Sequence, residues 1–321
     1  MRVRTFALGC LAVPALLLLV GLVVLGAAYV MGPVEVSPTT QELYQEIPWA
    51  TNVAPAVDST GATTGTTYLA YQPGDPVLEV VLRFEEGHFE IVPGLPGEAI
   101  HLEAEYDEGA YRLQPHYREG LPDRDRFELV FERTAHLAGL RRRIHQKADI
   151  SDNKIRVYLP PNIPMRLDVR VRRGDAEFDF SGLSLVSLRL DTKMGSTLVE
   201  CDRPNPVEME TCDIRSQMGE MRFRGLGYAA PRVLDFRGRM GDFELDLHGP
   251  GRKVTDIRLE ILMGELRVEV PRDLTLQIGS QKVLFGDMTT RSGGHRREVE
   301  SSPARLLRVE AKVRLGSMVI E

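Results

Sequence analysis

The side chains that could perform catalysis or bind a metal are dispersed along this 321-residue chain. Its seven histidines are scattered, and none shows the spacing to Cys, Asp or Glu that is typical of a metal site. The sequence has no phosphate-binding loop, dinucleotide fingerprint, zinc-protease helix or nucleophile elbow. We therefore predict no catalytic residue, no cofactor and no metal site. The net charge of −6 argues against nucleic-acid binding.

Carboxylates at alternating positions are the best candidates for an active or cation-binding site. They occur in two segments: Asp175, Glu177 and Asp179, and Asp242, Glu244 and Asp246. Clustered carboxylates could serve a carbohydrate-active β-helix enzyme, because glycoside cleavage uses paired acids. They could also hold calcium, which takes several oxygen ligands, although no turn motif supports this. Our interpretation is a solvated strand face, with the enzyme as the alternative.

Two cysteines, Cys201 and Cys212, flank the turn 202–206. The third, Cys10, lies in an apolar N-terminal run. A disulfide between Cys201 and Cys212 would be permitted in an oxidising compartment, and closing so short a loop would add on the order of 2–3 kcal/mol. Two buried free thiols are the alternative, and the sequence leaves both open.

The elements that must position these residues are short strands in which apolar and polar residues alternate. From residue 78 onward a unit recurs about every 22 residues: an alternating strand, a glycine, and a second alternating strand. The regular glycines are Gly174, Gly195, Gly219, Gly241, Gly264, Gly286 and Gly316, and earlier copies surround Gly87 and Gly109. The pattern is irregular around residues 121–161.

Apolar residues stand mainly seven and five positions before each glycine, and two and four positions after it. The two strands of a unit therefore bury one face each and need a corner at the glycine. Stacked units would share one core, which predicts an all-β fold: a β-solenoid over residues 78–321. A β-sandwich of hairpins that turn at each glycine is the alternative.

The outward positions differ in charge on the two sides of the glycine. Basic residues outnumber acidic ones before it, and acidic residues outnumber basic ones after it. We predict a basic face that could attract anionic wall polymers or lipid headgroups, against the alternative of plain solubility with cross-strand ion pairing. The basic residues of this face are Arg170, Arg172, Arg189, Lys193, Arg215, Arg237, Arg239, Arg258, Lys282, Lys312 and Arg314. A further basic cluster, residues 140–147, is interpreted as a solvated loop.

Residues 5–34 carry no charge, and Arg2 and Arg4 precede them. An apolar run of this length predicts a transmembrane helix within residues 1–34, with a cytoplasmic N-terminus and an extracytoplasmic C-terminal domain. A cleaved signal peptide is the alternative. Residues 35–77 include a small, polar stretch, 58–67, and are predicted to be a linker.

The sequence ends inside a repeat, at residues 315–321. We expect this last strand to be an uncovered edge, which could support docking or self-association.

Two segments of the chain are similar to segments of a known protein family. They are Leu159–Leu167, in which a proline pair separates two strands, and Arg173–Leu183, a strand that contains a glycine. Residues 78–321 resemble the bacterial "toast-rack" or putative-adhesin β-repeat family, which includes C-terminal domains of cell-wall-stress response proteins. The resemblance implies stacked β-repeats, no catalytic residues, and a role in envelope-stress sensing or adhesion. Unlike many members, this chain is expected to carry its anchor at the N-terminus without a cytoplasmic domain, which argues against direct signalling to the cytoplasm. The predicted function is a non-catalytic, membrane-anchored structural or interaction module of the cell envelope.

Overall fold

A computed structural model describes the repeat region and one earlier strand. The described residues are 38–47, 76–96, 98–120, 125–134, 153–252, 254–272, 274–290 and 305–321. The predicted membrane anchor, the polar stretch 58–67 and the basic cluster 140–147 lie outside these residues. No helix among the described residues is long and apolar enough to cross a membrane.

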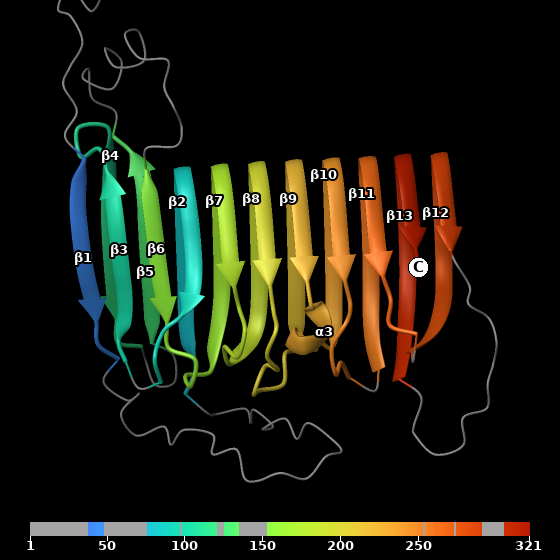
Figure 1. Cartoon of the computed structure of the whole chain (residues 1–321), viewed down its shortest axis with the longest axis horizontal. Helices are drawn as coiled ribbons and strands as arrows, with labels where there is room; N and C mark the ends of the chain where they lie inside the picture. Colours follow the sequence, from blue (N-terminus) through green and yellow to red (C-terminus); the bar gives the residue numbers. More distant parts are fainter. Residues whose placement is uncertain are drawn as a thin grey trace, which may run out of the picture.

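The described part of the chain is almost entirely β-structure, arranged as one 13-stranded sheet (Figure 1). The prediction of an all-β fold is confirmed. The strands are β1 (Thr39–Gln45), β2 (Leu78–Pro93), β3 (Ile100–Tyr106), β4 (Tyr111–Arg118), β5 (Arg126–Arg133), β6 (Lys154–Leu159), β7 (Met165–Asp179), β8 (Leu185–Glu200), β9 (Thr211–Arg224), β10 (Val233–Asp246), β11 (Val254–Glu269), β12 (Leu274–Thr290) and β13 (Arg305–Ile320), with one short helix, α3 (Leu226–Ala229).

The long strands β2 and β7–β13 are bent in the middle. In β8, Leu190 and Val199 are both fully buried although they are nine residues apart, so a straight strand would place them on opposite faces. The change of face occurs at Gly195, whose φ is 127°. We call the residues before the corner glycine the first half of the strand, and those after it the second half.

The corner glycines of neighbouring strands lie side by side, as the repeat predicts. Gly219 pairs with Gly195 on one side and Gly241 on the other. A Cβ atom added to Gly219 would lie 2.0 Å from the carbonyl oxygen of Gly195, and its φ is 132°. Each corner therefore requires glycine for two reasons: its backbone angle and the close approach of the next strand.

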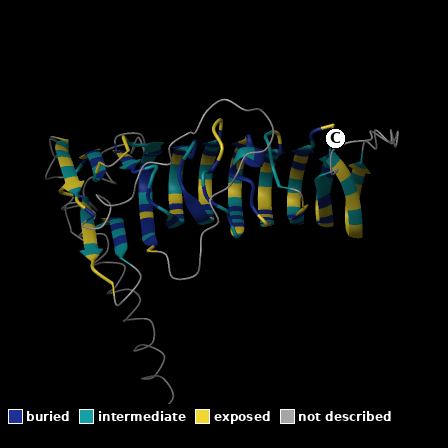
Figure 2. Ribbon diagram, turned by 90° about the horizontal axis from the view of Figure 1, so that it is seen from below, coloured by how far each residue is buried: buried dark blue, intermediate teal, exposed yellow. Residues whose placement is uncertain are grey.

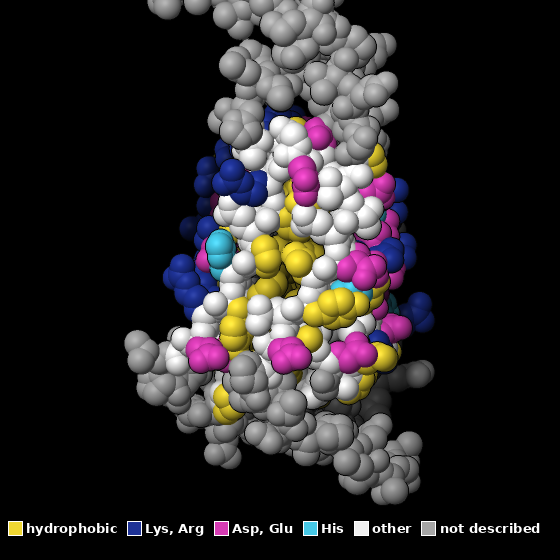
Figure 3. Space-filling model, turned by 90° about the vertical axis from the view of Figure 1, so that its left-hand side faces the viewer, with side chains coloured by type: hydrophobic (Ala, Val, Ile, Leu, Met, Phe, Trp, Pro, Cys, Tyr) yellow, Lys and Arg dark blue, Asp and Glu magenta, His cyan; other side chains and the backbone are white. Residues whose placement is uncertain are grey.

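The two halves bury their inward faces in one hydrophobic cluster that runs through the stack. Seen from the β1 end, hydrophobic side chains lie in the middle, Lys and Arg gather on the left flank, and Asp and Glu are more numerous on the right (Figure 3). The predicted columns of apolar side chains are confirmed; for example, Leu188, Cys212 and Leu234 are paired neighbours and all are buried.

The stack departs from the regular repeat at its N-terminal end. The first half of β2 pairs with β5 and its second half with β6, so these two strands together replace one bent strand. β5 ends at Arg133 and β6 begins at Lys154, and Asn153 stands beside Gly87 in place of a glycine. The replacement of one bent strand by two separate strands explains the irregular pattern around residues 121–161.

Two predictions for this end are wrong. Gly109 is not a corner glycine, because it lies in the turn between β3 and β4, which run antiparallel to β6 and β5. Residues 39–45 are not linker, because they form β1 and pair antiparallel with β3. Their side chains are polar apart from Leu43 and Tyr44, so this segment carries no strong strand signal.

The C-terminal end also departs from chain order. We expected residues 315–321 to be the uncovered edge, but β13 lies between β11 and β12 and pairs with both. The edge strand is β12, which has no fully buried residue (Figure 2). Its central residues Leu284 and Phe285 are 66% and 72% exposed.

Candidate functional site

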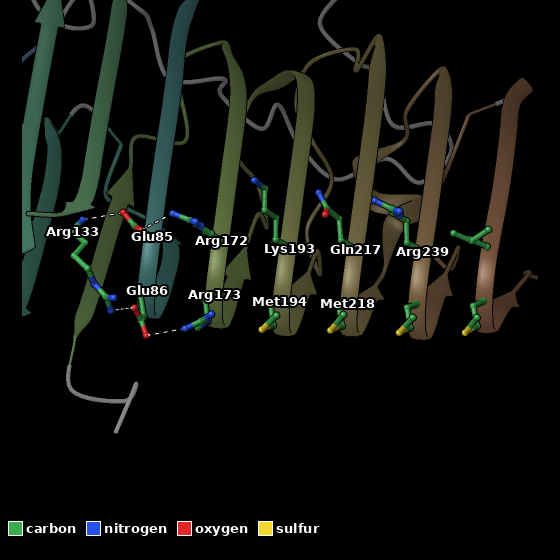
Figure 4. Close-up of a pocket in the computed structure, with 13 residues that line it drawn as sticks. Glu85, Glu86, Arg133, Arg172, Arg173, Lys193, Met194, Gln217, Met218 and Arg239 are labelled. Atoms are coloured by element: carbon green, nitrogen blue, oxygen red, sulfur yellow. Dashed lines mark hydrogen bonds and ion pairs between the residues drawn. The ribbon is translucent and has the colours of Figure 1, made fainter. Parts of the chain in front are cut away.

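A groove of about 450 Å³ runs along the corners of β7–β11 and ends at β2 and β5 (Figure 4). Its lining combines a row of apolar side chains with rows of charged ones. The lining residues are Glu85, Glu86, Arg133, Arg172, Arg173, Lys193, Met194, Gln217, Met218, Arg239, Met240, Leu262 and Met263.

The apolar row consists of the residues immediately before the corner glycines. Inward and outward positions alternate along a strand, and this alternation would point the residue before the glycine inward. The bend turns its side chain to the outside of the corner, so an apolar residue becomes exposed. We name the row the methionine ridge: Met194, Met218, Met240 and Met263, which are 41–46% exposed, continued by Leu315 and Phe285. Contiguous exposed apolar side chains such as this ridge, which crosses six neighbouring strands, are typical of a contact site.

A row of polar and basic residues lies beside the ridge, two positions before the glycines. In the part of the chain that the structure describes, Lys193 and Arg239 are exposed and make no ion pair. Arg172 in the same row is held by Glu85, with Nη1 2.7 Å from the carboxylate. Positive charge is therefore available to a ligand at Lys193 and Arg239.

Acidic residues lie on the other side of the ridge, one position after the glycines. Glu220 and Asp242 are exposed and without an ion pair among the described residues. Asp175 accepts a hydrogen bond from the backbone N–H of Ser196 on the next strand, at 3.1 Å. The ridge thus separates a row with free cations from a row with free carboxylates.

The β2 end of the groove is closed by a network around Glu86, whose side chain is 8% exposed. The carboxylate of Glu86 contacts Arg133, lies 3.5 Å from Arg173, and accepts a hydrogen bond from Tyr111 at 3.2 Å. Burial raises the pKa of Tyr111. Burial alone would lower the pKa of Arg133, but its hydrogen bond with Tyr111 and the charge of Glu86 raise it above its usual value. This network fixes β5, β2 and β7 to one another.

Many members of the predicted basic face are neutralised by acids. Three arginines are bonded to the aspartate two residues earlier on their own strand: Arg170 to Asp168, Arg215 to Asp213 and Arg237 to Asp235. Arg258 lies 3.6 Å from Glu310, and Lys312 and Arg314 both contact Glu260. Arg189, Lys193, Arg239 and Lys282 remain exposed and unpaired among the described residues. The pairs between β11 and β13 are the cross-strand ion pairing that the sequence analysis gave as the alternative. The pairs within one strand were not foreseen, although the spacing Asp-x-Arg could have shown them.

The two alternating carboxylate segments do not converge on one point. Side chains two residues apart on one strand point the same way but are about 6.6 Å apart, which is too far for a shared calcium ion without ligands from elsewhere. Asp179 instead accepts the backbone N–H of Ser181, and Glu244 lies 3.7 Å from Arg222.

Asp246, His248 and Glu269 form a group that the sequence prediction did not foresee. Their ligand atoms lie within 4.8 Å of one another, the only such group of His, Cys, Asp and Glu among the described residues. Asp246 already accepts hydrogen bonds from the backbone N–H groups of His248, at 2.8 Å, and Gly225, at 3.2 Å. These bonds assign Asp246 a structural role in holding the turn after β10.

Cys201 and Cys212 are both buried and are free thiols in the structure. Burial raises the pKa of both, and for Cys201 the neighbouring Cys212 adds to the rise. The disulfide stays a prediction: intact mass without reductant would be lower by two hydrogens if the bridge forms.

No family model matches the chain, and no curated protein matches it. Two solved structures resemble it. One is a "putative cell adhesion protein" from Clostridium sporogenes ATCC 15579, with 13% identity, a TM-score of 0.41, and coverage of 88% of this chain and 99% of that chain. The other is a "putative adhesin" from Bacteroides fragilis NCTC 9343, with 8% identity, a TM-score of 0.36, and coverage of 90% of this chain and 99% of that chain. At these scores neither likeness supports an argument about function.

Proposed function

We propose that this protein is a non-catalytic, membrane-anchored interaction module of the cell envelope, built as a β-solenoid. The observation that carries the proposal is the groove, in which an exposed apolar ridge runs beside cations that form no ion pair with any described residue. The partner we propose is an anionic envelope polymer. It would lie along the row that contains Lys193 and Arg239.

Electrostatic and apolar contacts can act together in this groove. Lys193 and Arg239 stand on β8 and β10, with β9 between them, so a linear polyanion crossing the strands could meet both. Their exposed charges attract a polyanion over a distance set by the ionic strength. The neighbouring ridge would bury apolar parts of the same ligand.

The anchor belongs to the proposal. The uncharged run 5–34 after Arg2 and Arg4 supports a single transmembrane helix with its N-terminus in the cytoplasm. The repeat domain would then be extracytoplasmic, where wall polymers and lipid headgroups are available. The family resemblance supports a link to envelope-stress sensing or adhesion.

The alternative is a carbohydrate-active enzyme. Glycoside cleavage by paired acids needs two carboxyl groups that face one sugar from opposite sides. The carboxylates that line the groove are Glu85 and Glu86, which are adjacent in sequence, and arginines hold both. Release of reducing sugar from envelope polysaccharide by the purified protein, lost in Glu85→Gln, would favour the enzyme.

Binding of the full-length protein to long-chain polyphosphate, a simple polyanion, tests the proposal. We expect affinity to fall as salt rises, and to fall roughly tenfold in the double variant Lys193→Gln/Arg239→Gln, because each exposed contact is worth about 0.5–1 kcal/mol.

The matched control is Arg170→Gln/Arg237→Gln, which removes two cations of the same face that aspartates already hold. It should bind nearly as well as the wild type. Binding that does not depend on salt, or equal losses in both variants, would contradict a polyanion site at Lys193 and Arg239. Binding to anionic vesicles but not to polyphosphate would identify a lipid surface instead.

A further inference from the structure

In the part of the chain that the structure describes, the exposed methionines are confined to one place. Among the described residues, Met165, Met209, Met221 and Met318 are fully buried. The four methionines more than 40% exposed all belong to the methionine ridge. Other apolar residues fit the same corner position, as Leu315 and Phe285 show on β13 and β12. Packing at the corner therefore does not explain why four consecutive strands present a thioether to solvent.

The strand register places these thioethers side by side. Met194 is paired with Met218, Met218 with Met240, and Met240 with Met263. Neighbouring strands are about 4.8 Å apart, which is close to twice a metal–sulfur bond of about 2.3 Å. Met194 and Met218 extend in parallel toward the same side (Figure 4). One ion could thus lie between two adjacent sulfur atoms without a change in the backbone.

The chemistry of the donors selects the ion. A thioether is a neutral, soft and polarizable ligand, which favours Cu(I) over hard ions such as calcium or magnesium. Glu220 and Asp242 flank the ridge without ion pairs among the described residues, so their charges would attract a monovalent cation. Lys193 and Arg239, on the other side of the ridge, would weaken that attraction.

We propose that Met194, Met218, Met240 and Met263 form a surface site for a soft monovalent metal ion, Cu(I). The ion is bound by pairs of sulfur atoms from adjacent strands. Binding involves no redox step and releases no proton, because the thioethers are neutral donors. The site does not depend on the polyanion that we propose for the basic row.

The test uses the full-length protein labelled with ¹³C at the methionine methyl groups. Ag(I), which resembles Cu(I) but does not change oxidation state, is added first, and Cu(I) is then added without oxygen in competition with a chromophoric chelator. We expect the four ridge methyl resonances to shift and those of the buried methionines to stay in place. Single Met→Leu variants assign the resonances.

The decisive variant replaces all four ridge methionines by leucine. Leu and Met have similar volumes, and Leu315 already occupies this corner position, so the fold should be retained. The variant should lose the Ag(I) and Cu(I) site. Met218→Leu alone should abolish the shift of the Met194 methyl resonance, which loses its adjacent sulfur atom, and should leave the Met240–Met263 pair able to bind. Met288→Leu, on β12 outside the ridge, is the matched control and should bind as the wild type does.

Three results would overturn the site: ridge methyl resonances that do not move, metal binding that survives in the fourfold variant, or metal bound at Cys201 and Cys212 instead. None of them bears on the polyanion, because the fourfold variant keeps Lys193 and Arg239. Polyphosphate binding by that variant therefore separates failure of one proposal from failure of the other.

Discussion

The corner glycines are the residues that the fold can least replace. Each one has a positive φ, between 116° at Gly264 and 152° at Gly87. At the corners from Gly174 onward, an added Cβ would also lie 1.8–2.0 Å from the carbonyl oxygen of a neighbouring glycine. That atom belongs to the backbone of a paired strand, so no side-chain movement relieves the contact.

Gly219→Ala should therefore destabilise the protein strongly. We expect a loss on the order of 3 kcal/mol or more in the free energy of unfolding, from the strained φ together with the contact to Gly195. Urea unfolding of the full-length protein, followed by circular dichroism, measures it.

Gly279→Ala is the matched control. Gly279 also lies within a strand, but its φ is not in the positive region and its nearest neighbour would be 3.8 Å from an added Cβ. Its stability should change by less than about 1 kcal/mol. Equal effects of the two substitutions would show that the corner contact is not what requires glycine.

The corners could be predicted from the sequence because their requirement is local and strict. The methionine ridge could not, because alternation places the residue before glycine on the inside, and only the bend exposes it. The same limit applies to Asn153, which stands at a corner without being glycine. The ion pairs of the basic face were within reach, since Asp168 and Arg170 are only two residues apart.

At the scale of strands, the pairing of β11 with β13 includes a charged cluster. Glu260 on β11 accepts a hydrogen bond from Lys312 at 2.8 Å and one from Arg314 at 3.2 Å. The hydrogen bond from Lys312 and the charges of both cations lower the pKa of Glu260, although partial burial opposes the shift. The ionised carboxylate is thus more stable in the folded protein than in the unfolded chain.

This shift makes the β11–β13 pairing sensitive to acid. Since the folded pKa is the lower one, the stabilisation is complete above the unfolded pKa of about 4.3 and is lost as pH falls through the folded value. Glu260→Gln should cost about 0.5–1 kcal/mol at pH 7 and less at pH 3. Urea unfolding at both pH values measures the difference.

Glu310→Gln is the control for this prediction. Glu310 on β13 is 63% exposed and lies 3.6 Å from Arg258. Its substitution should change stability less at pH 7. A loss from Glu260→Gln that is as large at pH 3 as at pH 7 would mean that the glutamate acts through packing rather than charge.

The order of the strands in the sheet could not be predicted from the repeat pattern of the sequence. Every bent strand has a glycine at its corner, so the corner of one bent strand fits that of any other. The local pattern therefore specifies that strands stack but not which are neighbours. For this reason the position of β13 between β11 and β12 and the replacement of one bent strand by β5 and β6 were both missed.

On the scale of the whole molecule, the stack has an open end at β12. This strand is paired only with β13 in the described sheet, and its exposed residues include Val283, Leu284 and Phe285. A long apolar edge strand offers backbone groups for pairing with another chain. We expect self-association of the protein through β12, rather than through the last strand of the sequence.

Phe285→Lys should reduce this association, because a charge at an edge opposes strand pairing. Leu315→Lys is the matched control, since Leu315 occupies the same corner position on β13, which is paired on both sides. Sedimentation of the full-length protein in detergent measures the dimer fraction as concentration rises. A wild type that stays monomeric, or equal effects of both variants, would exclude the β12 edge.

β13 is synthesised after β12 but pairs between β11 and β12, and this order affects how the domain folds. During synthesis β12 emerges while its final partner does not yet exist, and β11 still presents a free edge. The pairs Gly286–Gly316 and Gly316–Gly264 make the same close contact, so β12 could attach directly to β11 in a premature arrangement. The completed protein then forms only if the last strand displaces this contact, and the slowest step of maturation would be an exchange of partners rather than a collapse.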